Sequence, residues 1–151
     1  MGAEKPVDPT DARESVGLTI GSRLENLSMV HALIQSIARQ HEMDEETENA
    51  LIIAVIEAGT NAIQHGNAFA EDKSVSFLFT VSPREITIQV DDSGNGFDPA
   101  RVSNPTDSEH ILSPHGRGIY LMRSLMDEVR FGRTGNGTSV TLRKTRLAPA
   151  R

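Results

Sequence analysis

Cysteine is absent from this chain of 151 residues, so a disulfide framework and thiolate chemistry are both excluded. Basic residues are also in the minority: 15 Lys and Arg stand against 21 Asp and Glu, which gives a formal net charge of −6. Nucleic-acid binding requires a basic surface, which a chain of this charge is poorly suited to provide. We therefore expect no direct nucleic-acid partner.

Long apolar runs are missing as well. The longest, Leu51 to Ile56, is far shorter than the roughly 20 residues that a membrane-spanning helix needs. The first residues lack the apolar centre of a signal peptide, and Pro6 stands where a myristoylation motif has Ser or Thr. These absences predict no membrane insertion and a cytoplasmic location.

Three common catalytic signatures are lacking too. The 5 histidines show no spacing typical of zinc ligands, and no serine-centred nucleophile elbow occurs. Gly116-Arg117-Gly118 is not followed by Gly-Lys-Ser/Thr, so it is not a Walker A loop.

The chain does have the composition of one globular domain, with 37% hydrophobic and 24% charged residues. Its length is sufficient for a sizeable core. We predict a flexible N-terminal tail at 1–15, a folded domain at 16–145 and a C-terminal tail at 146–151.

Apolar spacing predicts the element order β-α-α-β-β-α-β-β. A capping-box sequence, Ser22-Arg23-Leu24-Glu25, precedes the first helix; Asp44 is the expected N-cap of the second, which Gly66 ends. Strands joined by short turns, such as Pro83-Arg84, pair antiparallel. We therefore predict an α+β two-layer sandwich, a mostly antiparallel mixed sheet with helices on one face. The predicted strands cover 16–20, 75–81, 86–91, 129–131 and 138–142, and the helices cover 24–37, 44–65 and 119–126.

Glu57 and Asn61 form the first candidate functional pair, because side chains four residues apart project from one face of a helix. A carboxylate can take a proton, and an amide oxygen is a hard ligand of the kind that Mg²⁺ binds. Taken alone, such a pair is more typical of a solvent-facing helix edge.

Asp92 follows a predicted strand, where its carboxylate could accept a hydrogen bond from an exocyclic amine such as that of adenine. Gly94 and Gly96 would let the backbone approach a flat ligand closely. The same Asp-Ser-Gly-Asn-Gly sequence is also ordinary turn chemistry, so this motif alone is weak.

Gly116, Arg117 and Gly118 precede the third predicted helix, and a helix N-terminus can bind phosphate through its free N–H groups. Arg117 would add positive charge there. Residues 97–117, a long segment between the two glycine motifs, have the length of a functional lid.

The ordered set of Glu57-x-x-x-Asn61, Asp92-x-Gly94-x-Gly96-Phe97, a lid, Gly116-x-Gly118 and Gly137-Thr138 is rarer than any one motif. It resembles the Bergerat-type ATP-binding fold shared by gyrase, Hsp90, histidine kinases and MutL. Within that fold, residues 16–144 look most like the small bacterial anti-sigma-factor serine/threonine kinases.

The resemblance implies ATP and Mg²⁺ as cofactors, with Asn61 holding the metal and Glu57 acting as the catalytic base. It also implies that Asp92 and Thr138 contact adenine. The implied partners are a small anti-anti-sigma, STAS-like protein that becomes phosphorylated and a sigma factor; members often dimerise, which leaves a homodimer open.

Three alternatives remain at this stage. The first is a non-catalytic switch in which ATP orders the lid and changes a partner surface. The second is a detached catalytic domain of a histidine kinase, and the third is a gyrase-type ATPase in which Glu57 activates water. The chain lacks the phosphoacceptor hairpin of the second and the transducer domain of the third.

Overall fold

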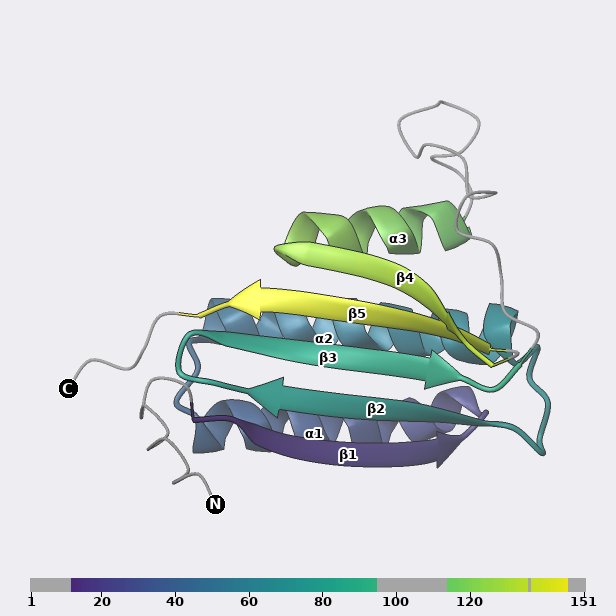
Figure 1. The fold of residues 1–151 in the computed structure, drawn as a ribbon, viewed down its shortest axis with the longest axis horizontal. Coiled ribbons are helices and arrows are strands. Elements are labelled where there is room, and N and C mark those ends of the chain that lie inside the picture. The colour runs from purple at the N-terminus through teal and green to yellow at the C-terminus, as the bar shows by residue number, and fades with distance from the viewer. Residues whose placement is uncertain (1–11, 95–113, 136, 147–151) are drawn as a thin grey trace, which may run out of the picture.

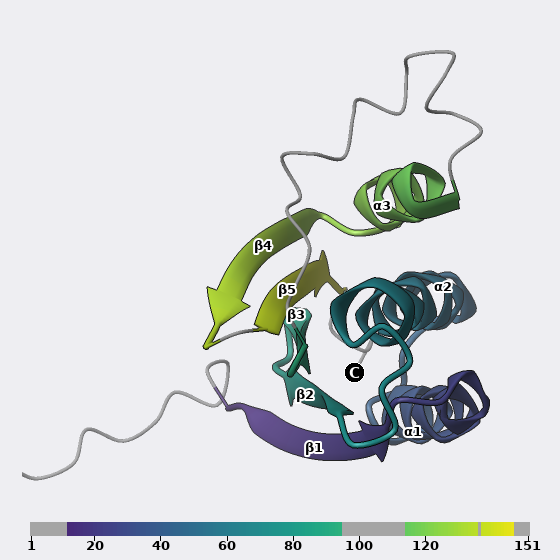
Figure 2. The same cartoon turned by 90° about the vertical axis from the view of Figure 1, so that its right-hand side faces the viewer.

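The computed structural model describes residues 12–94, 114–135 and 137–146. They form two layers, a five-stranded sheet and three α-helices that all lie on the same face of it (Figure 1, Figure 2). The predicted α+β sandwich and its element order are therefore confirmed. None of the helices in these ranges is long and apolar enough to cross a membrane.

The sheet is antiparallel at each of its four pairings, in the order β1-β2-β3-β5-β4. Side chains on a strand alternate between faces, and in β2 and β3 every second residue, from Val75 to Val81 and from Ile86 to Asp92, is buried. The other face carries Ser, Thr and Gln side chains, with Leu78 among them. The strands are β1 (Glu14–Gly21), β2 (Ser74–Val81), β3 (Glu85–Asp92), β4 (Glu128–Thr134) and β5 (Gly137–Thr145).

β1 begins two residues before the domain start that we predicted, because Glu14 and Ser15 still pair with β2. The capping-box prediction was wrong. Ser22 is buried and its Oγ accepts a hydrogen bond from Asn67, so a short 3-10 turn, Leu24–Asn26, precedes α1 (Leu27–Gln40) without a side-chain cap.

The second predicted helix is α2 (Glu45–Asn61) followed by a π-helical turn, Ala62–Gly66. Asp44 does occupy the N-cap position, although its side chain makes no capping hydrogen bond. π-Helical turns inside α-helices are rare and are frequent at functional sites. Here the turn directly follows Asn61, so this end of α2 has a local geometry that is frequent at functional sites.

The third helix, α3 (Pro114–Leu125), begins five residues earlier than we predicted. Gly116, Arg117 and Gly118 therefore lie inside its first turns rather than ahead of it, and proline at the first helical position is favourable because that N–H has no helical partner. Residues 114–117 of the predicted lid are helical, and 97–113 lie outside the described residues.

Candidate functional site

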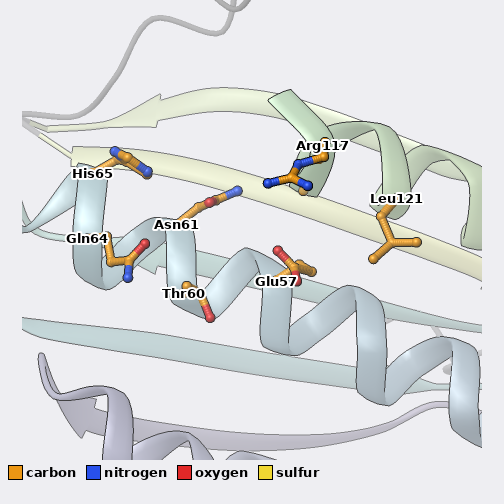
Figure 3. A pocket seen from close by; sticks show the side chains of 8 residues that line it. Glu57, Thr60, Asn61, Gln64, His65, Arg117 and Leu121 are labelled. Carbon is orange, nitrogen blue, oxygen red and sulfur yellow. The ribbon is translucent and has the colours of Figure 1, made fainter. Parts of the chain in front are cut away.

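Glu57 and Asn61 face α3 across a cleft of about 420 Å³ (Figure 3). The α2 wall of the cleft continues into the π-helical turn, and the α3 wall contributes Arg117, whose side chain extends over the cleft. No described residue hydrogen-bonds or ion-pairs with the Glu57 carboxylate. The cleft is lined by Glu57, Thr60, Asn61, Gln64, His65, Arg117, Gly118 and Leu121.

Gly118 lets α3 come close to this pair. A Cβ at this position would lie 2.8 Å from Glu57 Oε2 and 3.6 Å from Asn61 Nδ2. The glycine therefore allows close packing against α2, and its phosphate-binding role stays a prediction.

Asn61 is only 6% exposed, and its Nδ2 has no hydrogen-bond partner among the described residues. An unpaired polar group that is buried costs free energy, so buried amides normally have partners. An amide left unpaired beside an open cleft is a group that a ligand can satisfy.

A second hollow adjoins the first and shares Asn61 with it. It lies between α2, α3 and the sheet, and it has only about 10 Å³ of space. Besides Asn61, two polar residues, Asp92 and Thr138, interrupt its apolar wall. The complete lining is Ala58, Asn61, Ala62, Val90, Asp92, Met122, Phe131, Thr138 and Val140.

Asp92 is the last residue of β3 and is buried. Its Oδ1 accepts hydrogen bonds from the backbone N–H groups of Gly94, at 3.2 Å, and Thr138, at 3.1 Å. Burial raises the pKa of Asp92 above its ordinary value of 3.8, and these two bonds oppose the rise only in part. The fold therefore keeps a carboxyl here at a cost to its own stability.

Three glycines make room for Asp92. A Cβ on Gly66 would overlap the Asp92 carboxylate, and one on Gly137 would overlap the Asp92 carbonyl oxygen. A Cβ on Gly94 would overlap the carbonyl oxygen of Gly66. Gly94 thus allows a close contact within the protein, and its predicted role in the approach of a ligand stays a prediction.

Asn67, which sequence reasoning missed, fixes the turn after Asp92. It is 0% exposed, and its Oδ1 accepts from the backbone N–H of Ser93 at 3.0 Å. Its Nδ2 donates to Ser22 Oγ at 2.6 Å and to the Ser74 carbonyl at 2.9 Å. The only available signal was an Asn directly after a helix-ending glycine, which is ordinary turn chemistry.

Of the three remaining residues that we predicted for the site, the structure describes two. Thr138 lies in β5 beside Asp92, and Gly116 lies in the first turn of α3. Gly96 lies outside the described residues. Within the described ranges no cluster of three or more His, Asp or Glu side chains could hold a metal ion unaided.

Comparison with known protein families gives one match that covers most of the chain. The model of the histidine kinase-like ATPase domain matches residues 20–144. This range contains both hollows, the strands β2, β3 and β4, all of β5 except Thr145, and only the last two residues of β1.

Curated relatives have similar lengths. The chain is 33% identical to the serine-protein kinase RsbW of Bacillus licheniformis, over 88% of this chain and 86% of that one. It is 32% identical to the anti-sigma F factor of Clostridium novyi, over 82% of this chain and 88% of that one. In the crystal structure of the RsbU and RsbW domains of Rv1364c from Mycobacterium tuberculosis, a similar fold is found at 18% identity and a TM-score of 0.65, over 89% of this chain and 33% of that one.

Proposed function

The chain belongs to the histidine kinase-like ATPase family and is a relative of its serine-protein kinases, and we propose that it phosphorylates a serine or threonine of a small STAS-like regulatory protein, using ATP. The observation that carries this proposal is the pairing of an unpartnered carboxylate, Glu57, with the buried amide of Asn61, whose Nδ2 has no described partner, in a single cleft. A sigma factor is the second proposed partner, in keeping with the anti-sigma F factor among the relatives.

Base recognition is assigned to the narrow hollow. Asp92 uses Oδ1 for two backbone N–H groups, which leaves Oδ2 to accept from the exocyclic amine of adenine. Thr138 lies beside it on β5, and the apolar residues of the hollow suit the faces of a purine ring. This set of residues fits an adenine nucleotide.

The phosphate end is assigned to the open cleft. Arg117 supplies a positive charge on the α3 side, where it can pair with phosphate oxygens. Asn61 supplies an amide oxygen for Mg²⁺, which typically keeps several waters and is held by one or two protein groups plus phosphates. The absence of an acidic cluster among the described residues agrees with this mode of binding.

When bound, Mg-ATP supplies the phosphoryl group to be transferred. The protein's own contribution is mainly positioning and charge, as is general for phosphoryl transfer. Glu57 would accept the proton of the partner's hydroxyl as its oxygen bonds to the γ-phosphorus and the bond from that phosphorus to the departing ADP breaks. Arg117 would offset the negative charge of the phosphate oxygens. The named activity of the relatives favours this kinase over a non-catalytic switch.

Incubation with γ-labelled ATP and a panel of purified STAS-like domains tests the proposal. We expect label on a serine or threonine of one domain, and no label when that residue is replaced by alanine. Binding of ATP and of a STAS-like domain without any transfer would refute the kinase and leave a binding switch in its place.

Replacing Asp92 with asparagine should weaken ATP binding and yet stabilise the ligand-free protein at neutral pH. With Oδ1 held by the two backbone N–H groups, the asparagine NH₂ would face the adenine amine, at a cost of about 1.5–3 kcal/mol. Because the folded pKa of Asp92 is raised, its contribution to stability is present below pH 3.8 and is lost as pH rises through the folded pKa.

Calorimetric titration with ATP, and melting curves from below pH 3.8 to neutral pH, measure both effects. The Tm advantage of Asp92→Asn over the wild type should grow with pH. Asp91→Asn is the matched control, since Asp91 precedes Asp92 on β3, lines neither hollow and accepts from Gln89. Unchanged ATP affinity in Asp92→Asn would exclude Asp92 from base recognition.

A further inference from the structure

The seam between α2 and α3 holds a second groove, beyond the cleft that contains Glu57. Its volume is about 540 Å³. Ile53 of the groove lies one helical turn before Glu57, and Leu125 lies one turn after Leu121 of the cleft. The groove therefore continues the cleft along the same pair of helices. It is lined by Glu45, Glu46, Asn49, Ala50, Ile53, Ser124, Leu125 and Lys144.

The groove has an exposed apolar side chain. Ile53, which lines it from α2, is 42% exposed, and Leu125, which lines it from α3, is half-buried. Exposed apolar groups that line a groove with a polar rim are typical of interaction sites. Single exposed apolar residues are common on protein surfaces, and Ile53 differs from these in lining a groove that continues the cleft of Glu57.

The far end of the groove is acidic. Glu45 and Glu46, in the first turn of α2, are exposed and make no ion pair with any residue that the structure describes. Lys144 also lines the groove, but its Nζ donates to the Leu125 carbonyl at the end of α3. The end of the groove thus presents two carboxylates that have no ion-pair partner among the described residues, with the ammonium group of Lys144 also in the lining.

We propose that this groove docks the phosphoacceptor protein, through the surface that carries its serine or threonine. An apolar side chain of that protein packs against Ile53 and Leu125, and a Lys or Arg pairs with Glu45 and Glu46. The inference rests on the proposed kinase function, which requires an acceptor hydroxyl to reach Glu57 from outside the protein. The seam leads directly from the acidic end to that carboxylate.

The helix geometry sets the spacing of these features. Glu46 and Glu57 are eleven residues apart on one helix, which is about 16 Å at the α-helical rise. In an extended segment the basic residue would stand about five residues from the phosphorylated one. In a folded acceptor the same separation of about 16 Å applies across its surface.

Steady-state transfer to the STAS-like domain that the wild-type protein phosphorylates provides the test. The double variant Glu45→Lys/Glu46→Lys should raise KM for that domain by roughly tenfold, with kcat and the KM for ATP unchanged. The difference should shrink as salt is added. The matched control is Glu71→Lys/Asp72→Lys, an exposed acidic pair that lines neither the cleft nor the groove and should leave all three parameters unchanged.

A second variant, with its own control, tests the apolar part of the groove. Ile53→Ser should also raise KM for the domain by roughly tenfold. Leu78→Ser, which removes a side chain of similar exposure, 45%, on the opposite face of the sheet, should not. Wild-type KM values in both groove variants would overturn the docking surface while the kinase stands. Transfer to none of the domains by the wild type would overturn both.

Discussion

Replacing Glu57 with glutamine should lower kcat for phosphoryl transfer by about 10²–10⁴-fold, the usual contribution of a positioned general base. The change removes the carboxylate and keeps the shape of the side chain, so the packing against Gly118 should persist. ATP affinity should not change, because in our assignment Glu57 acts on the acceptor hydroxyl and Asp92 on the base. A loss confined to kcat would therefore identify the chemical step.

Single-turnover transfer to the STAS-like domain, with ATP affinity measured in parallel, gives both quantities. Glu48→Gln is the matched control, since Glu48 lies on the same helix and lines neither hollow. Transfer by Glu57→Gln at the wild-type rate would show that the base is another group. A parallel loss of ATP affinity would instead place Glu57 in nucleotide binding.

Gly94→Ala should lower the free energy of unfolding by more than about 3 kcal/mol, or prevent folding altogether. The added Cβ would overlap the carbonyl oxygen and carbon of Gly66, and it would lie 2.8 Å from the Cα of Asn67. All of these atoms belong to the backbone, so no side chain can rotate away to relieve the overlap. The strain falls on the turn that follows Asp92.

Urea denaturation of Gly94→Ala and Gly132→Ala compares a crowded glycine with an open one. A Cβ on Gly132, in β4, would have no described atom within 4 Å, so its replacement should change stability little. Equal stability of the two variants would mean that the close approach of Gly94 to Gly66 does not constrain the fold.

The strands and most of the helical residues followed from the sequence, because apolar side chains repeat at the spacing that one buried face requires. The pair Glu57 and Asn61 was predictable for the same reason, since four residues along a helix return to one face. The structure places both in one cleft with Arg117, while their chemical roles stay predictions.

Local signals were less reliable where long-range contacts decide the outcome. Ser22 heads a good capping box, yet it bonds to Asn67, which is 45 residues away in sequence. The start of α3 was predicted too late because Gly116 and Gly118 weaken a helix, while the contact with α2 favours a glycine at 118. Gly66 and Gly137 both lie close to Asp92, but all three are far apart in the sequence. Their contact was therefore not predictable from local sequence signals.

The small volume of the hollow around Asp92 has a kinetic consequence. A space of about 10 Å³ cannot admit a purine, so the proposed base site requires side chains that line the hollow to move when the nucleotide binds. Under the proposed assignment, nucleotide association would therefore include a conformational step besides the encounter itself. The rate of that step would limit association at high nucleotide concentration, and release would require the same movement.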